Sequence, residues 1–257
     1  MLEINELTVT YPEVTAVDNV SFAVAKGEAL GLVGESGSGK STIALAIMRL
    51  IDRPGKIENG QVWFNGRDLR QLPECEMIAV RGGQISLIFQ DPFTSLNPVL
   101  TVGDQIAEAV RQHQGLSRKM AWRKAIEMLA LVQIREPAQR IGDYPHQFSG
   151  GMRQRVMIAM ALACQPQLLI ADEPTTALDV TIQAEIIRLL KHLQRQLGLS
   201  IIYITHNFGI VKEVCDRVAV LHGGKIVESG PTAQVIGAPR DLYTRRLIDC
   251  LKVLKGN

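Results

Sequence analysis

Cysteine is scarce in this chain, and its few cysteines lie far apart. Cys75, Cys164, Cys215 and Cys250 are the four among 257 residues, and no two of them form a C-x-x-C pair. Structural zinc sites need closely spaced ligands, and disulfide frameworks belong mainly to small secreted domains. The spacing argues against both, and it favours isolated or buried thiols in a reducing cytosol.

Long apolar runs and an excess of one charge are also missing. No apolar stretch approaches the ~18–20 residues that span a bilayer, and residues 1–14 lack the basic and apolar regions of a signal peptide. The 28 basic and 26 acidic residues are mixed along the chain, with a net charge of +2. Nucleic-acid binders usually carry a basic face or run. We therefore expect no nucleic-acid partner, and a chain without a membrane span that can still dock on a membrane protein.

The composition that is present suits a sizeable folded core. Hydrophobic residues make up 46% of the chain, and its length fits one α/β domain with an insertion, or two small lobes. Apolar runs at 29–33, 85–89, 167–172 and 200–205 predict buried strands. Because helical patterns separate these runs, we expect a mostly parallel sheet covered on both faces. The first 30 residues alternate more loosely and predict an antiparallel β part.

The chain changes character between residues 95 and 165. Periodic apolar positions in Val102–Val110 and Trp122–Val132 predict helices, which indicates a helical insertion in the α/β core. Two further helices are expected, an amphipathic one over 182–197 and a last one over 241–254. The predicted domains are an α/β core at 1–94 and 166–235, a helical subdomain at 95–165, and a C-terminal helical tail at 236–257.

Residues 34–41 read GESGSGKS, a G-x-x-x-x-G-K-[ST] loop between a predicted strand and a predicted helix. Its glycines let successive N–H groups point at one anion, and the helix N-terminus adds positive partial charge there. Lys40 can reach the β- and γ-phosphates, and the Ser41 hydroxyl can ligate Mg²⁺. A glycine-rich turn with an accidental lysine is the alternative, and the flanking strand and helix count against it. The loop predicts a nucleoside triphosphate site in a P-loop NTPase core.

Two carboxylates follow the apolar run 168–171. Asp172 ends the predicted strand, at the edge where open α/β sheets bind ligands, and can hold Mg²⁺ through water. Glu173 can accept a proton from the attacking water. An acidic pair that caps the next helix is the alternative, and the phosphate loop upstream favours the catalytic interpretation.

Three further polar features have both a functional and a structural interpretation. His206 follows the strand at 200–205, where an imidazole can reach a γ-phosphate or can be merely structural. Gln90 follows the strand at 85–89 and can present its amide to Mg²⁺ and water, or be an ordinary loop residue. Residues 148–155, FSGGMRQR, open a helix that is either a second anion-binding N-terminus or a simple N-cap.

Taken together, these motifs resemble those of the ATP-binding subunit of an ABC transporter, over nearly the whole chain. GESGSGKS resembles the Walker A motif, LLIADEP at 168–174 the Walker B motif with its catalytic glutamate, and SGGMRQR at 149–155 the ABC signature. Met152 stands where many members have glutamine, and this departure leaves the serine and the glycines in place. The resemblance implies an ATPase.

The remaining positions resemble smaller motifs of the same family. Gln90 resembles the Q-loop glutamine, and His206 the switch histidine. Asp179, in ALD at 177–179, resembles the D-loop, and Tyr11 the aromatic A-loop residue that stacks on adenine. The catalytic residues implied are Glu173, His206 and Gln90, and the Mg²⁺ ligands implied are Ser41, Gln90 and Asp172. The ATP-binding residues implied are Tyr11, Gly34, Ser36, Gly37, Ser38, Gly39, Lys40, Ser41, Thr42, Asp172, Ser149, Gly150, Gly151 and Asp179.

Within the family, the chain resembles the oligopeptide, dipeptide and nickel importer branch. The segment QDPFTSLNP at 90–98, the SGGM variant and APRDLYTRRL at 238–247 carry this likeness. The last segment resembles P-x-H-P-Y-T-R-x-L, but Arg240-Asp241-Leu242 departs from its His-Pro. Many peptide-importing members continue into a cysteine-containing extension that can hold an iron–sulfur cluster. With only Cys250 in this segment, we expect no iron–sulfur cluster. The short C-terminal segment favours nickel or another metal chelate as the transported substrate.

The resemblance also implies partners. Members pair head to tail, so that each ATP lies between one subunit's Walker A motif and the other's signature. We expect a heterodimer with a second ABC ATPase, on two transmembrane permease subunits, at the cytoplasmic face of the inner membrane. A solute-binding protein outside the membrane would act indirectly. The alternative is a soluble ABC ATPase of a multi-enzyme assembly, for phosphonate C–P cleavage or iron–sulfur assembly. A DNA-repair ABC ATPase would need a long coiled-coil insertion, which this chain lacks before residue 148.

Overall fold

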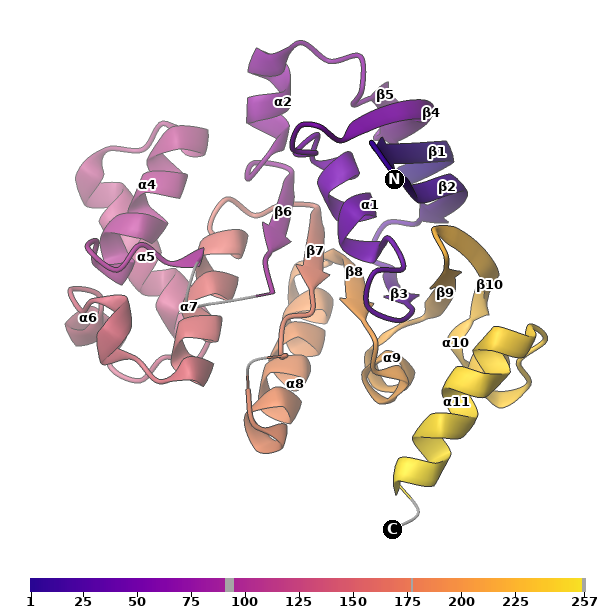
Figure 1. The fold of residues 1–257 in the computed structure, drawn as a ribbon. Coiled ribbons are helices and arrows are strands. Elements are labelled where there is room, and N and C mark those ends of the chain that lie inside the picture. Colours follow the sequence, from indigo (N-terminus) through magenta and orange to yellow (C-terminus); the bar gives the residue numbers. More distant parts are fainter. Residues whose placement is uncertain (91–94, 177, 256–257) are drawn as a thin grey trace. The chain divides into compact units, whose positions relative to one another are not determined.

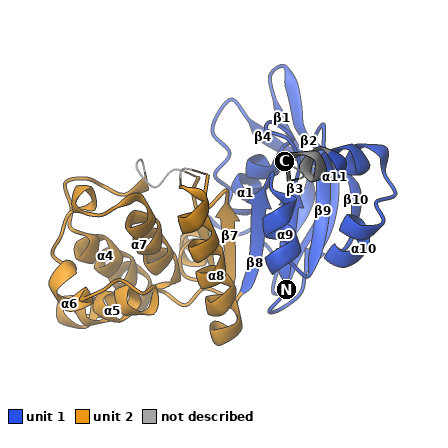
Figure 2. Ribbon diagram, turned by 90° about the horizontal axis from the view of Figure 1, so that it is seen from below, with its two compact units in different colours: residues 1–73, 200–257 blue, residues 74–199 orange. Residues whose placement is uncertain are grey.

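The computed structural model describes residues 1–90, 95–176 and 178–255 (Figure 1). The chain forms two compact units. Unit 1 consists of residues 1–73 and 200–257, and unit 2 of residues 74–199 (Figure 2). These units group the chain by its internal packing, and the domains expected from the sequence stay a prediction.

Unit 1 begins with an antiparallel sheet, as predicted. Its strand order is β2-β1-β4-β5. The strands are β1 (Leu2–Tyr11), β2 (Val14–Val24), β4 (Lys56–Phe64) and β5 (Arg67–Asp68).

The loose alternation of the first strand has a local cause. Leu2 and Ile4 are buried at even positions, whereas Leu7 and Val9 are buried at odd positions. Glu6 lies between them with φ 51°, and the register with β2 shifts between Ile4 and Leu7. Because side chains of a strand alternate between faces, the extra residue of a bulge is needed to return Leu7 to the buried face.

The second sheet segment of unit 1 carries the phosphate loop. Its strand order is β10-β9-β3-β8, in which β3 pairs in parallel with both β8 and β9, and β10 is antiparallel to β9. All five residues of β3 are buried, as expected for a strand inside a covered sheet. The strands are β3 (Ala29–Val33), β8 (Ser200–Thr205), β9 (Arg217–His222) and β10 (Lys225–Pro231). The helices of this unit are α1 (Lys40–Ile47), α9 (Phe208–Val214), α10 (Thr232–Gly237) and α11 (Leu242–Lys255).

Unit 2 combines two parallel strands with helices. The strands β6 (Ile85–Ile88) and β7 (Leu168–Asp172) pair in parallel. The helical insertion expected from the sequence is present, and its loop at 115–117 supplies both helix ends: Gly115 ends α4 in the left-handed conformation and Ser117 caps α5. The helices are α2 (Glu74–Val80), α4 (Val102–Gln114), α5 (Arg118–Leu131), α6 (Pro137–Arg140), α7 (Gly150–Leu162) and α8 (Val180–Leu197), with a 3₁₀ turn η1 (Pro145–Gln147).

The predicted fold class is confirmed, although several short elements were not foreseen. The helices α2, α9 and α10 span only six or seven residues, too few for a 3.6-residue period to stand out in the sequence. Two thiols, Cys164 and Cys215, are buried, whereas Cys75 is exposed. Across the described ranges, each helix is too short or too polar to cross a bilayer.

Candidate functional site

The phosphate loop joins β3 to α1 and is tightly packed on one side. Gly39, the N-cap of α1, has φ 101°, and a Cβ built there would lie 2.3 Å from the Ala16 oxygen. A Cβ at Gly34 would lie 2.3 Å from the Leu221 oxygen. The loop therefore needs glycine at both positions, because its backbone runs against that of neighbouring strands. Gly37, at φ 80°, has open space around it and needs glycine only for its backbone angle.

Lys40 folds back into this loop. Its side chain is 5% exposed, and its Nζ donates to the oxygens of Gly34 at 2.8 Å and Glu35 at 2.7 Å. The Ser38 hydroxyl lies 3.4 Å from the same nitrogen. The loop thus holds a cation at its centre and a helix N-terminus beside it, which is the donor set that phosphate oxygens require. Next to Lys40, the exposed Ser41 and the half-buried Thr42 begin α1.

His206 leaves the sheet beside the phosphate loop. In the parallel pair of β3 and β8, Val33 is opposite Thr205. The loop that follows Val33 and the exposed His206 that follows Thr205 therefore start at one edge of the sheet. Asn207 begins α9 by accepting the Gly209 N–H at 2.8 Å, which fixes the backbone just after the histidine.

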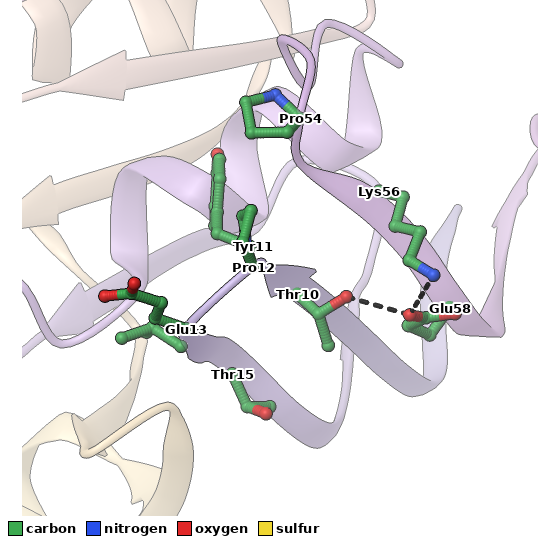
Figure 3. A pocket seen from close by; sticks show the side chains of 9 residues that line it. Thr10, Tyr11, Pro12, Glu13, Thr15, Pro54, Lys56 and Glu58 are labelled. Carbon is green, nitrogen blue, oxygen red and sulfur yellow. Dashed lines mark hydrogen bonds and ion pairs between the residues drawn. The ribbon is translucent and has the colours of Figure 1, made fainter.

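Tyr11 borders a pocket at the end of β1 (Figure 3). The pocket has a volume of about 510 Å³ and is lined by Thr10–Thr15 and by three residues on or before β4. A Cβ at Gly55 would lie 2.5 Å from the Tyr11 ring, so glycine there makes room for the ring. Glu58 accepts hydrogen bonds from Lys56 and Thr10, and these two bonds, that of Lys56 first, lower the pKa of its carboxyl. Tyr11 is half-buried in this lining, and an aromatic ring of this kind can pack on a flat apolar group.

In unit 2, β6 and β7 bring Gln90 and Glu173 together. Ile88 is opposite Ala171 in the parallel pair, and Gln90 Nε2 donates to Glu173 Oε2 at 3.2 Å. The Thr176 hydroxyl donates to the same carboxylate oxygen at 2.6 Å. Thr176 was missed by the sequence reasoning, and its place three residues after Glu173 was the available signal. The half-buried Asp172 is the last residue of β7.

The backbone at Glu173 is unusual. Its φ of 44° lies in the left-handed region, which residues with a side chain rarely adopt. Such strain costs on the order of 1–3 kcal/mol and is found preferentially at functional sites. At Glu173 the two hydrogen bonds to its carboxylate fix the side chain of this strained residue.

The signature segment begins α7. Ser149 is its N-cap and accepts the Met152 N–H at 3.4 Å. A Cβ at Gly151 would lie 2.6 Å from Ile182 Cγ2 on α8, so this glycine serves close packing of the two helices. Ser149 is therefore the N-cap of α7, as one of the two interpretations predicted. Anion binding at the same N-terminus stays a prediction.

Two arginines contact the loop that precedes the signature segment. The Arg140 guanidinium lies 4.7 Å from the centre of the Phe148 ring, and Arg153 Nε donates to the Pro145 oxygen at 2.7 Å.

Asp179 caps α8 by accepting the Ile182 N–H at 3.0 Å. Ala177 of the predicted D-loop and residues 91–94 of the predicted importer segment lie outside the described residues.

The comparisons with known proteins agree with the motifs. The sequence profile of the family described as "ABC transporter" matches residues 17–176. The oligopeptide transport ATP-binding protein OppD of Bacillus subtilis is 50% identical, covering 100% of this chain and 73% of its own length. The dipeptide transport ATP-binding protein DppD of Escherichia coli is 49% identical, covering 98% of this chain and 78% of its own.

Solved structures show the same fold. The ATP-binding cassette MJ0796, in a dimeric post-hydrolysis state bound to ADP and Pi, superimposes with a TM-score of 0.79 at 29% identity, over 90% of this chain and 99% of that one. CbiO1 of Clostridium perfringens, part of the transporter complex cbiONQ, gives a TM-score of 0.80 at 25% identity, over 98% of each chain. The chain belongs to the ABC transporter family, as one of its ATP-binding subunits.

Proposed function

We propose that this protein hydrolyses ATP to drive peptide import through membrane permease subunits. The observation that carries the proposal is the phosphate loop closed around Lys40, in a chain about half identical to ATP-binding proteins of oligopeptide and dipeptide transport. The alternative of a soluble multi-enzyme assembly has no comparable support among these relatives.

The phosphates of ATP would bind where the Lys40 ammonium now lies. Its present partners are two backbone carbonyls, at Gly34 and Glu35. Phosphate oxygens carry more charge than carbonyls and make stronger, charge-assisted hydrogen bonds. The side chain would therefore exchange these carbonyls for phosphate oxygens. In this proposal the loop residues Gly34, Ser36, Gly37, Ser38, Gly39, Ser41 and Thr42 line the phosphates, and Tyr11 stacks on adenine.

Glu173 is proposed as the general base of hydrolysis. A carboxylate can take the proton of the attacking water while the water oxygen bonds to the γ-phosphorus, and ADP leaves. Gln90 and Thr176 hold this carboxylate through hydrogen bonds of 3.2 and 2.6 Å, which orients it before substrate arrives. His206, exposed at its strand end, is proposed to hydrogen-bond the γ-phosphate.

Magnesium belongs to the proposal as well. Oxygen donors of the kind it prefers occur in each unit: the exposed Ser41 hydroxyl in unit 1, and Gln90 and Asp172 in unit 2. When bound, Mg²⁺ would neutralise charge on the β- and γ-phosphate oxygens. The assignment of Ser41, Gln90 and Asp172 to this ion stays a prediction.

The signature is proposed to act on ATP held by a second ATPase. The exposed Ser149 and the half-buried Gly150 and Gly151 form a helix N-terminus that suits an anion, and Asp179 would lie at the same contact between subunits. Support comes from MJ0796, a cassette solved as a dimer. We propose a heterodimer on two permease subunits, with peripheral attachment to the cytoplasmic face of the inner membrane and a solute-binding protein outside.

Peptides are the proposed cargo, ahead of nickel or metal chelates. The relatives from B. subtilis and E. coli are named for oligopeptide and dipeptide transport. A further relative, 48% identical, is named the glutathione import ATP-binding protein GsiA of Pectobacterium atrosepticum. The cargo itself would contact other subunits, so the support lies in these likenesses.

Deletion of the gene in its source organism tests the function. We expect uptake of radiolabelled di- and oligopeptides to fall, and the unaltered gene to restore it. Glu173→Gln should bind ATP but not restore uptake, because a general base contributes roughly 10²–10⁴-fold to such a rate. Normal uptake in the deletion strain, with no membrane subunits retained by the tagged protein, would favour the soluble assembly instead.

A further inference from the structure

The C-terminal segment 238–247 marks the importer branch in the sequence, yet the proposed function gives it no role. Its helix α11 belongs to unit 1 and lies against β10 (Figure 1). The phosphate loop belongs to the same unit. Contacts between this segment and the loop would therefore affect nucleotide binding.

The start of α11 is fixed in place by two carboxylates. Glu228 on β10 accepts the backbone N–H groups of Arg240 at 2.9 Å and Asp241 at 3.2 Å. Asp241 in turn accepts the N–H groups of Tyr243 at 2.8 Å and Thr244 at 3.2 Å, the pattern of a helix N-cap. The departure from the branch's His-Pro thus supplies a cap that holds the first turn of α11 at β10.

The fixed first turn presents Tyr243 to the phosphate loop. Its ring packs on the His222 ring, with centroids 3.9 Å apart and planes tilted by 31°. Its hydroxyl oxygen accepts the backbone N–H of Glu35 at 3.3 Å. These three residues line one pocket of about 530 Å³. Burial, the largest cause, raises the pKa of Tyr243.

The peptide group that Tyr243 contacts also holds Lys40. The Glu35 N–H and the Gly34 carbonyl belong to one planar peptide group, and that carbonyl accepts from Lys40 Nζ at 2.8 Å. Because the group is rigid, fixing its N–H also fixes the direction of its carbonyl. The next carbonyl, of Glu35, accepts from Lys40 at 2.7 Å and from the Ser38 N–H at 3.2 Å.

We propose that Tyr243 is a positioning residue for the phosphate loop, which it holds through the Gly34–Glu35 peptide group. The inference rests on the proposed binding of ATP at this loop. Without the hydroxyl, the peptide group gains rotational freedom that ATP must remove on binding, so affinity falls. The carboxylate of Glu173 is untouched by this change, so the chemical step keeps its rate.

Tyr243→Phe tests the inference, because it removes the hydroxyl and keeps the ring on His222. The matched control is Tyr203→Phe on β8, whose buried hydroxyl has no hydrogen-bond partner among the described residues. We would measure the Kd of ADP with Mg²⁺ by calorimetry, which avoids turnover, together with the KM and kcat for ATP and the Tm.

We expect Tyr243→Phe to raise Kd and KM about 3- to 10-fold, the effect of one hydrogen bond. Its kcat should stay near that of the unaltered protein, and its Tm near that of the control. Unchanged Kd and KM would overturn the inference, as would an equal loss of affinity in Tyr203→Phe. If the unaltered protein bound neither ADP nor ATP, the proposed function would fail, and this inference with it.

Discussion

At the scale of single residues, Glu173 is the proposed base, and its backbone and side chain are both held in an unusual way. Its left-handed backbone, at φ 44°, is a conformation that costs energy for any residue with a Cβ. Two donors on its carboxylate, Gln90 and Thr176, fix the side chain of the strained residue. Hydrogen bonds to a charged carboxylate are worth more than neutral ones, which makes each donor a measurable contributor.

Thr176→Val should lower kcat while leaving KM for ATP nearly unchanged. The valine keeps the shape of threonine but removes the hydroxyl 2.6 Å from Glu173 Oε2, so the base is less well oriented. We expect a fall of roughly 10- to 100-fold, the size of one hydrogen bond to a charged group. Steady-state kinetics of the complex with its partners would measure it.

Thr176→Ser is the matched control for this change, because it keeps the hydroxyl. Its kcat should stay near the unaltered value. If valine and serine gave the same kcat, Thr176 would have no role in orienting Glu173. A rise in KM with constant kcat would likewise contradict the assignment.

At the scale of elements, glycines decide how closely two segments approach. The signature glycine Gly151 lets α7 approach α8, because a Cβ there would meet Ile182 Cγ2 at 2.6 Å. Its neighbour Gly150 has more room, since a Cβ would lie 3.4 Å from Leu178. The two glycines therefore look alike in the sequence but differ in what the packing demands of them.

Gly151→Ala should destabilise the protein, and Gly150→Ala should not. Overpacking of this kind costs about 1–3 kcal/mol of unfolding free energy. Adding Ile182→Ala should recover part of the loss, because it removes the methyl group that the new Cβ meets. A double-mutant cycle in urea would measure the coupling. Equal stability of the two alanine variants would show that the helices can separate at no cost.

At the scale of the whole molecule, we propose that a second ATPase completes the ATP site. The phosphate loop supplies Lys40 at the N-terminus of α1, and the signature at Ser149 begins a second helix N-terminus, which we propose also binds phosphate. If both serve one ATP in an assembled pair, Ser149 has two roles, as an N-cap in its own chain and as a donor to the partner's nucleotide.

Ser149→Gly separates these two roles. Glycine at an N-cap costs only a few tenths of a kcal/mol, whereas Ser149→Ala should cost about 1 kcal/mol of stability. We expect Ser149→Gly to keep the Tm nearly unchanged yet lower the ATPase rate of the assembled complex, because the hydroxyl is gone. ATPase activity that follows Tm across both variants would mean that Ser149 is a cap alone.

Much of the fold could be predicted because it is encoded locally. The strand β8 was expected at 200–205 and is found there, and the helix expected at 182–197 is α8. The strand appears in the sequence as one continuous apolar run, and the helix is long enough for its apolar period to appear. The Walker and signature motifs are likewise runs of adjacent residues, so spacing and composition suffice to recognise them. The short helices α9 and α10, by contrast, have too few residues to show a period.

The sequence by itself determined the family, the phosphate loop and the identities of the candidate catalytic residues. Only the tertiary structure decided which distant residues form hydrogen bonds. Gln90 and Glu173 are 83 positions apart in the sequence, and Tyr243 and Glu35 are 208 apart. Such contacts have no local signature, because they arise when parallel strands end at one edge or a terminal helix docks on a loop. The side-chain chemistry of each residue is given by the sequence, whereas its hydrogen-bond partner depends on which distant segment the fold places beside it.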